Sequence, residues 1–113
     1  MQVGSNVKGF QKGDRIAYTG PNANAEFTSV SSDFCIKLPD HVSYEVGASV
    51  LLQGLTAMAL SRKVHPVQKG ETVLVHAAAG GTGLLIVQLC KLAGATVIGT
   101  TSTDEKKKIA MDA

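Results

Sequence analysis

The chain has 113 residues, a net charge of +2 and 44% hydrophobic residues, which is the composition of a folded globular domain with a modest core. This balance excludes a disordered chain, and the small net charge with only 4% aromatic residues argues against a nucleic-acid-binding surface. The longest apolar runs, such as residues 84–87, are far shorter than the about 20 residues of a membrane-spanning helix.

The N-terminus and the two cysteines bear on the compartment of the protein. The first residues, MQVGS, lack the basic and apolar regions of a secretory signal. Cys90 lies in an apolar helical pattern and is predicted to be a small buried hydrophobe, whereas Cys35 lies in a strand-like segment. We therefore expect a cytoplasmic protein with free thiols, and a disulfide is the less favoured alternative.

Residues 1–40 predict antiparallel β structure with short connections. Turn signals at residues 12–14 and 19–22 flank a strand over residues 15–18. Two more strands are predicted in this part, over residues 25–30 and 34–38.

The middle of the chain is predicted to be helical. Ser43 is a candidate N-cap, and helix-compatible residues extend over 44–52 and 55–63, with Gly54 interrupting them. Pro66 ends this stretch. We expect two short helices that follow the β-rich part.

The last part of the chain predicts the order β-α-β-α. Residues 72–76 and 95–100 are almost wholly apolar and rich in β-branched residues, as in strands buried on both faces of a parallel sheet. A predicted helix over residues 82–93 separates them, and Gly94 fits its C-terminal end. The sequence Ser-Thr-Asp-Glu from Ser102 onward matches a capping box for a last helix.

Two similar segments, FQKGDRIAY and VQKGETVLV, each place Gln-Lys-Gly and an acidic residue before a predicted strand. Glycine and an acidic residue side by side are typical of turns. We interpret the pair as one turn chemistry used twice, because a single distant pair does not make a repeat array.

Small residues cluster between the first buried strand and the helix that follows it, in the sequence AAGGTG. The cluster approximates the pattern G-x-G-x-x-G, with Gly80 and Gly83 in the second and third glycine positions and Ala78 in the first. Small residues let the backbone approach a pyrophosphate closely, and free N–H groups at the helix start face the phosphates. The flanking elements favour a dinucleotide-binding unit, and a tight β-α turn without a ligand is the alternative.

The end of the second strand predicts which dinucleotide binds. Sites for NAD place an acidic residue there to hold the ribose 2′-hydroxyl, but this strand ends Gly-Thr-Thr-Ser. Hydroxyls with the nearby Lys106 suit a 2′-phosphate, so the pattern favours NADPH over NADH. The alternatives are a helix cap for Ser102 and a solvated helix face for residues 106–108. Asp104 and Glu105 would repel a phosphate unless they point away from it.

Several segments resemble a known family. KLPDHVSYEVGASVLLQGLTAMAL, followed by VLVHAAAGGTGLLIVQLCKLAGATVIGTTST, is similar to the zinc-independent, zeta-crystallin-like quinone oxidoreductases of the medium-chain dehydrogenase/reductase superfamily. VKGFQKGDRIAY and AEFTSV fit the same family, so the resemblance covers nearly the whole chain from Val7 onward. Members combine a GroES-like β domain with a Rossmann domain and transfer hydride from NADPH to quinones or related enones.

The resemblance implies an α/β fold in three parts. Residues 1–42 would be the C-terminal part of the GroES-like β domain, 43–68 the crossing helices and 69–113 the start of the Rossmann NADPH-binding domain. Thr56 would lie near the nicotinamide ribose or amide, and Thr82 stands where Val is usual, with little effect expected. The implied cofactor-binding residues are Thr56, Ala79, Gly80, Gly81, Thr82, Gly83, Ser102 and Lys106.

The resemblance also bears on metal binding. Zinc-dependent relatives carry a four-cysteine lobe after the turn that matches residues 13–14, where this chain has only Cys35. They also place a cysteine ligand just before the segment that matches residues 54–56, where this chain has Leu-Leu-Gln. The three histidines lack metal-ligand spacing, and His76 is predicted to be a packed or capping residue, so we predict no metal.

The resemblance leaves parts of the family's chain unmatched. The N-terminal β strands, the later Rossmann strands and the usual dimer edge have no counterpart in these residues. We therefore expect an internal section of a homo-oligomeric reductase, with uncovered apolar faces at residues 73–75 and 97–98. The alternative is a non-catalytic module for nucleotide binding, RNA binding or a structural, crystallin-like role.

Overall fold

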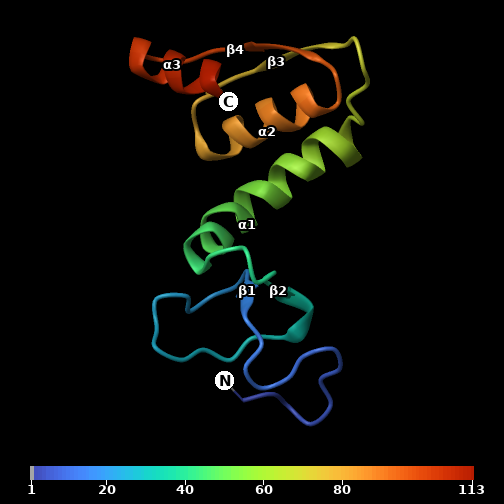
Figure 1. Ribbon diagram of the computed structural model, residues 1–113, viewed down its shortest axis with the longest axis vertical. Helices are drawn as coiled ribbons and strands as arrows, with labels where there is room; N and C mark the ends of the chain where they lie inside the picture. Colours follow the sequence, from blue (N-terminus) through green and yellow to red (C-terminus); the bar gives the residue numbers. More distant parts are fainter. Residues whose placement is uncertain (1) are drawn as a thin grey trace. The chain divides into compact units, whose positions relative to one another are not determined.

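The computed structural model describes residues 2–113 and contains two compact units (Figure 1). One unit ends at Leu52, and the other runs over Gln53–Ala113. Within the described residues, no helix has both the length and the apolar character needed to cross a membrane.

The first unit is built on two short antiparallel strands, β1 (Ile16–Tyr18) and β2 (Cys35–Lys37). Ala17 of β1 pairs with Ile36 of β2, as the sequence predicts for an antiparallel pair. A single 3-10 turn, Ser32–Phe34, leads directly into β2.

The predictions of short connections and of a strand over residues 25–30 are wrong. The chain between β1 and β2 forms bends and irregular structure, and these residues pair with neither strand. Phe27 is 88% exposed, so the apolar residues of this segment have no core to face. A strand-like composition forms a strand only when a partner and a buried face are present.

Arg15 links β1 to the segment that follows β2. Its guanidinium donates to the carbonyl oxygens of Pro39, Asp40 and Val42 at 3.0, 3.2 and 2.6 Å, and it lies 4.5 Å from the centre of the Tyr44 ring. These contacts hold the segment after β2 in place at the point where the first helix begins.

Helix α1 (Tyr44–Met58) begins where the sequence predicts, because the Ser43 hydroxyl accepts the backbone N–H of Val46 at 3.2 Å. The predicted interruption at Gly54 is wrong, since the helix passes through it. A glycine inside a helix costs only about 1 kcal/mol, which its neighbours offset. A π-helical segment, Ala59–Val64, follows α1 and ends before Pro66.

The second unit contains the predicted β-α-β-α order (Figure 1). Its elements are β3 (Thr72–Val75), α2 (Gly81–Leu92), β4 (Thr96–Gly99) and α3 (Asp104–Asp112). The two strands are parallel, and Val75 pairs with Gly99 at their carboxyl ends. Gly94 has a φ of +82° and closes α2, as the sequence predicts.

The core of the second unit lies between the sheet and α2. Val75, Ala78 and Val87 are buried together, with Val73 and Val97 packed partly against them. On the other face of the sheet, Leu74 and Ile98 remain more than half exposed, so these strands are not buried on both faces. The predicted uncovered surface at residues 73–75 and 97–98 is limited to these two side chains, because Val75 is buried and Val73 and Val97 pack partly against the core. The two described cysteines are free, and burial raises the pKa of the Cys90 thiol, as expected for an inert core residue.

The two Gln-Lys-Gly turns have the same hydrogen bonds, which confirms their interpretation. Asp14 accepts the backbone N–H of Gln11 at 2.8 Å, and Glu71 accepts that of Gln68 at 2.9 Å. Each acidic residue also donates its own N–H to the carbonyl of that glutamine. The carboxylates bind different neighbours, since Asp14 lies 2.8 Å from Lys37 Nζ.

Candidate cofactor-binding site

The parallel register of β3 and β4 brings two segments together at the carboxyl ends of the strands. The Thr100 backbone N–H donates to the Val75 carbonyl at 3.0 Å, and the Ala78 N–H donates to the Thr100 carbonyl at 2.9 Å. The loop after β3 therefore lies beside the residues that follow β4. In parallel sheets this edge is where ligands bind.

The loop after β3 has room only for small residues. A Cβ at Gly83 would overlap the carbonyl oxygen of Ala77 and lie 3.0 Å from Ala78 Cα. A Cβ at Gly80 would lie 3.2 Å from the Ala77 carbonyl oxygen, which already accepts the Gly80 N–H at 2.8 Å. The glycines are thus required for close packing of the loop on the start of α2.

The start of α2 is open to an anion. Gly80 is its N-cap, has an extended backbone and offers no side chain to cap the helix. The first turn of any helix carries N–H groups that its own carbonyls cannot accept, and the helix dipole places partial positive charge there. Gly81, Thr82 and Gly83 form this first turn.

A cavity of about 400 Å³ lies next to this helix start. Four of the residues that the resemblance implies line it: Ala79, Gly80, Ser102 and Lys106. The remaining lining residues are Ala77, Thr100 and Thr101. The structure thus brings the glycine loop and the end of β4 to one hollow.

Ser102 and Lys106 meet at the edge of this cavity. The Lys106 ammonium donates to the Ser102 hydroxyl at 3.3 Å. The prediction that a capping box starts at Ser102 is wrong, because Thr103 is the N-cap of α3 and accepts the Lys106 backbone N–H at 3.3 Å. Ser102 is therefore not used as a helix cap.

The Glu105 carboxylate is held at the start of α3. Its own backbone N–H and the Thr103 hydroxyl bind it, and these hydrogen bonds lower the pKa of Glu105. Glu105 is not among the residues that line the cavity, and neither is Asp104.

Thr56 lies on α1, outside the set of residues that line the cavity. Gln53, three residues earlier on the same helix, approaches the glycine loop, because a Cβ at Gly81 would lie 3.4 Å from its side chain. Residues three apart on a helix lie on the same side of it. This part of α1 therefore adjoins the start of α2, within the second unit.

Sequence reasoning missed Ala77 and Gln53 as residues of this region, and it considered Thr100 and Thr101 only as part of the Gly-Thr-Thr-Ser end of the second strand. The parallel register was the signal for the two threonines, since it places the residues after β4 beside the loop. The sequence does not indicate the role of Ala77, because a left-handed backbone, here with a φ of +52°, is uncommon for alanine. Gln53 could be found only from the packing of α1.

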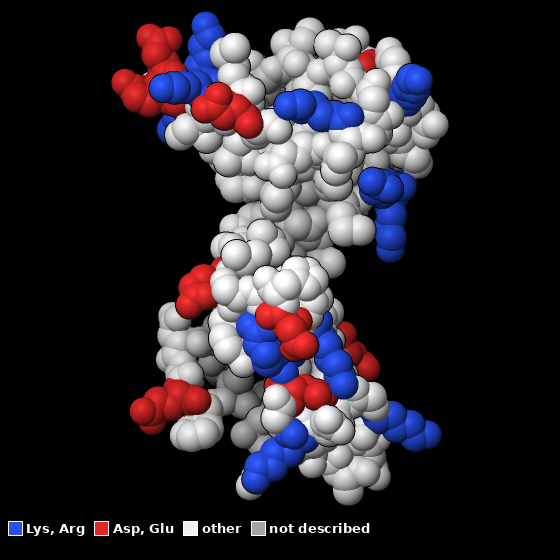
Figure 2. All heavy atoms as spheres, in the orientation of Figure 1, with Lys and Arg blue, Asp and Glu red and all other residues white. Residues whose placement is uncertain are grey.

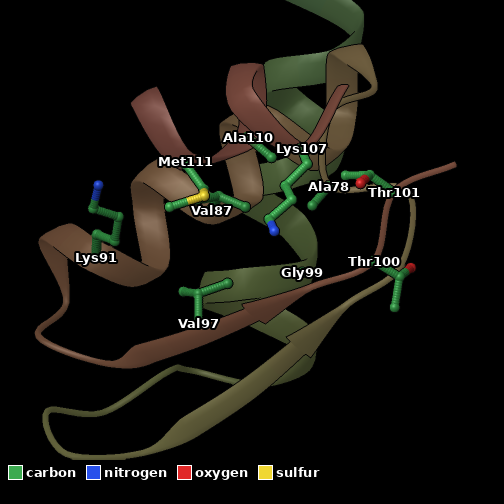
Figure 3. Close-up of a pocket in the computed structure, with 10 residues that line it drawn as sticks. All are labelled: Ala78, Val87, Lys91, Val97, Gly99, Thr100, Thr101, Lys107, Ala110 and Met111. Atoms are coloured by element: carbon green, nitrogen blue, oxygen red, sulfur yellow. The ribbon is translucent and has the colours of Figure 1, made fainter. Parts of the chain in front are cut away.

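A second and larger cavity, of about 630 Å³, lies between α2, β4 and α3. Val87, Val97 and Met111 line it, and the side chain of Lys107 extends into it (Figure 3). None of the eight predicted cofactor-binding residues lines this cavity. It shares Thr100 and Thr101 with the smaller cavity.

His76, predicted to be a packed or capping residue, is exposed and therefore not packed, and its Nδ1 lies 3.1 Å from the Thr100 hydroxyl. Among residues 2–113, no three His, Cys, Asp or Glu side chains gather in a way that could hold a metal ion. The chemistry available at this site is therefore that of backbone N–H groups, hydroxyls and one ammonium group.

Comparison with known proteins gives close relatives for nearly the whole chain, although no protein-family model matches it. A quinone oxidoreductase of Pseudomonas aeruginosa is 44% identical over 110 residues, which is 96% of this chain and 34% of that protein. The crystal structure of Escherichia coli quinone oxidoreductase complexed with NADPH has a TM-score of 0.93 and 38% identity, over 98% of this chain and 35% of that one. The crystal structure of CurK enoyl reductase has a TM-score of 0.90 and 32% identity, over 97% of this chain and 33% of that one.

The chain spans about a third of the length of these relatives. Over that third, both the sequence and the backbone of this chain are similar to those of the relatives. The similar region includes the β-α-β-α unit that carries the glycine loop. The predicted α/β fold and the predicted family are confirmed. Over nearly its whole length the chain is therefore similar to about a third of the length of the quinone oxidoreductases of the medium-chain dehydrogenase/reductase superfamily, the family that its sequence resembles.

Proposed function

We propose that this chain is the NADPH-binding section of a reductase that transfers hydride to quinones or related enones. The observation that carries the proposal is the hollow at the carboxyl ends of β3 and β4. There Gly80, which is the N-cap of α2, borders one cavity together with Ser102 and Lys106. The relatives support it, since one is a quinone oxidoreductase complexed with NADPH and another is an enoyl reductase.

The residues present fit a pyrophosphate at the start of α2. The glycines carry no side chain of their own, Gly80 leaves the helix without a capping side chain, and the Gln53 side chain lies beside Gly81. A diphosphate here would accept N–H groups of the first helical turn and interact favourably with the helix dipole. Ala79, Gly80, Gly81, Thr82 and Gly83 are the proposed pyrophosphate-binding residues.

The residues at the end of β4 fit a 2′-phosphate. The Lys106 ammonium supplies positive charge, and the hydroxyls of Thr101 and Ser102 supply hydrogen bonds at the same cavity wall. An acidic residue that would prefer an unphosphorylated ribose does not line this wall. Ser102 and Lys106 are therefore proposed to select NADPH over NADH.

The bound dihydronicotinamide supplies the hydride, and the protein supplies orientation and exclusion of water. Thr56 is proposed to hold the nicotinamide ribose or amide, because α1 adjoins the start of α2 through Gln53 and Gly81. We retain the three-part division as part of this proposal: a GroES-like end over residues 1–42, crossing helices over 43–68 and a Rossmann start over 69–113.

The small net charge of +2 does not favour a nucleic-acid ligand. Basic and acidic side chains both occur on the face shown in Figure 2. RNA binding requires a basic surface, because affinity comes mainly from neutralised phosphates. A non-catalytic, RNA-binding role is therefore an outcome to be tested against the reductase proposal.

Titration of the 113-residue chain with NADPH and with NADH tests the proposal. We expect NADPH to raise the melting temperature and to bind more tightly than NADH, measured by the fluorescence of the reduced nicotinamide. A chain whose melting temperature responds to neither cofactor would not be a cofactor-binding section. A parallel titration with RNA at two salt concentrations would favour the nucleic-acid role only if binding falls steeply with salt.

A further inference from the structure

We propose that Thr100 is a positioning residue that sets the shape of the pyrophosphate loop through its contact with Ala77. This inference rests on the proposed function, because the loop's role is the binding of NADPH. The contacts of Thr100 belong to the loop whether or not a cofactor binds.

Ala77 is the bend of the loop. Its φ of +52° lies in the left-handed region, which costs a residue with a Cβ about 1–2 kcal/mol. Such a conformation persists only where surrounding contacts hold it. The residue follows directly on His76 at the end of β3 and precedes the buried Ala78.

Thr100 holds this bend from the neighbouring strand by three separate contacts. Its N–H donates to Val75 and its carbonyl accepts from Ala78, at 3.0 and 2.9 Å. Its hydroxyl accepts the N–H of Ala77 itself, at 3.3 Å. The two backbone bonds continue the strand pairing, whereas the hydroxyl contact depends on the side chain and is directed at the left-handed residue.

The position of Ala77 in turn determines the rest of the loop. Its carbonyl oxygen accepts the Gly80 N–H at 2.8 Å and occupies the space that a Cβ at Gly83 would need. A rotation of Ala77 would therefore displace the backbone that forms the start of α2. The hydroxyl of Thr100 acts on the pyrophosphate-binding backbone without having to touch the pyrophosphate.

His76 completes the arrangement. Its Nδ1 lies 3.1 Å from the Thr100 hydroxyl, which can donate to this nitrogen while it accepts the Ala77 N–H. Both hydrogen-bonding capacities of the hydroxyl are then directed at the loop, and its rotamer is defined. A valine at residue 100 has the same shape and lacks both bonds.

Amide hydrogen exchange of the cofactor-free chain tests the link directly. We expect Thr100→Val to raise the exchange rates of the Ala77 and Gly80 amides by about tenfold, the equivalent of one hydrogen bond. Thr100→Ser retains the hydroxyl and should restore the rates. Thr96→Val is the matched control, because it makes the same change at the other end of β4. Equal exchange rates in Thr100→Val and in the wild type would overturn the proposal.

A second substitution tests the same link through stability, and if Thr100→Val unfolds the wild-type chain, Ala77→Gly should restore its folding. Ala77→Gly removes the cost of the left-handed backbone, so the hydroxyl should matter less in its presence. We expect Thr100→Val to lower the melting temperature by several degrees in the wild-type background and by much less in the Ala77→Gly background. An equal drop in both backgrounds would contradict a link through Ala77.

Measurements of cofactor binding distinguish a failure of the positioning role of Thr100 from a failure of the proposed function. Thr100→Val should weaken NADPH, NADH and ADP-ribose by one common factor, because all three carry the pyrophosphate. A loss confined to NADPH would mean that Thr100 acts at the 2′-phosphate, which overturns the positioning role. If the wild-type chain binds none of the three, the proposed function fails, while the exchange rates still decide whether Thr100 holds the loop.

Discussion

The Lys106 ammonium donates to the Ser102 hydroxyl at 3.3 Å, across the start of α3. This contact joins two residues that the sequence predicts for a 2′-phosphate. The N-cap of the helix is Thr103. A charged and a neutral donor thus lie side by side at the wall of the cavity. The pair makes the choice between NADPH and NADH testable by substitution.

Replacing Lys106 by alanine should lower NADPH affinity by about tenfold, because a hydrogen bond to a charged group contributes about 1.5–3 kcal/mol and this site is exposed. NADH affinity should change by less than about twofold. Titration followed by nicotinamide fluorescence measures both. Lys108→Ala, on the same helix and outside both cavities, is the control. Equal losses for the two cofactors would contradict the assignment.

Gly83→Ala should destabilise the second unit by about 2 kcal/mol, the cost of overpacking where backbone must shift. The added Cβ would overlap the Ala77 carbonyl oxygen, which belongs to the loop backbone. Gly54→Ala is the contrasting substitution, because a Cβ there meets nothing within 4 Å and lies inside α1. We expect it to stabilise the chain by about 0.5–1 kcal/mol. Urea unfolding measures both, and the reverse order would refute the packing argument.

The Glu71 carboxylate should make the chain sensitive to acid. The backbone N–H of Gln68, and then His65, lower the pKa of Glu71 from its ordinary value of 4.5. A group with a lowered pKa stabilises the fold above its ordinary pKa, and this stabilisation is lost as pH falls through the lowered value. The difference in melting temperature between wild type and Glu71→Gln should therefore shrink below pH 4.5.

The control for this pH dependence is Glu26→Gln, a substitution in the exposed connection between β1 and β2. Thermal unfolding from pH 7 downward should show a pH-dependent difference for Glu71→Gln and a constant one for Glu26→Gln. A constant difference for both variants would show that the turn carboxylate does not contribute through its charge.

Substitutions on the two faces of the parallel sheet should have unequal effects. Val87 is 5% exposed, so Val87→Ala should cost about 2 kcal/mol through lost burial and a cavity. Leu74→Thr and Ile98→Thr change side chains that are 57% and 54% exposed and should alter stability by less than about 0.5 kcal/mol. Chemical unfolding compares them, and a large loss at Leu74 would indicate that this face is covered in solution.

Several predictions that depend on local chain order proved accurate, although the capping box expected from Ser102 did not, since Thr103 caps α3. The Gln-Lys-Gly turns, the Ser43 cap, Gly94 and the β-α-β-α order are each decided by residues within a few positions of one another. The expected strand over residues 25–30 and the expected break at Gly54 were wrong. At Gly54 packing of the helix outweighed a local preference of about 1 kcal/mol. At residues 25–30 a local strand preference of about 1 kcal/mol or less was not enough in the absence of packing.

The sequence by itself determined that a strand, a glycine-rich loop and a helix follow one another, because small residues and apolar runs are read in order along the chain. Only the tertiary structure decided that Thr100 binds Ala77 and that Gly99 must lack a side chain, since a Cβ there would lie 2.7 Å from Ala78 Cβ. These contacts join residues more than 20 positions apart. They depend on the register of β3 with β4 and on one left-handed alanine, which local preferences do not specify.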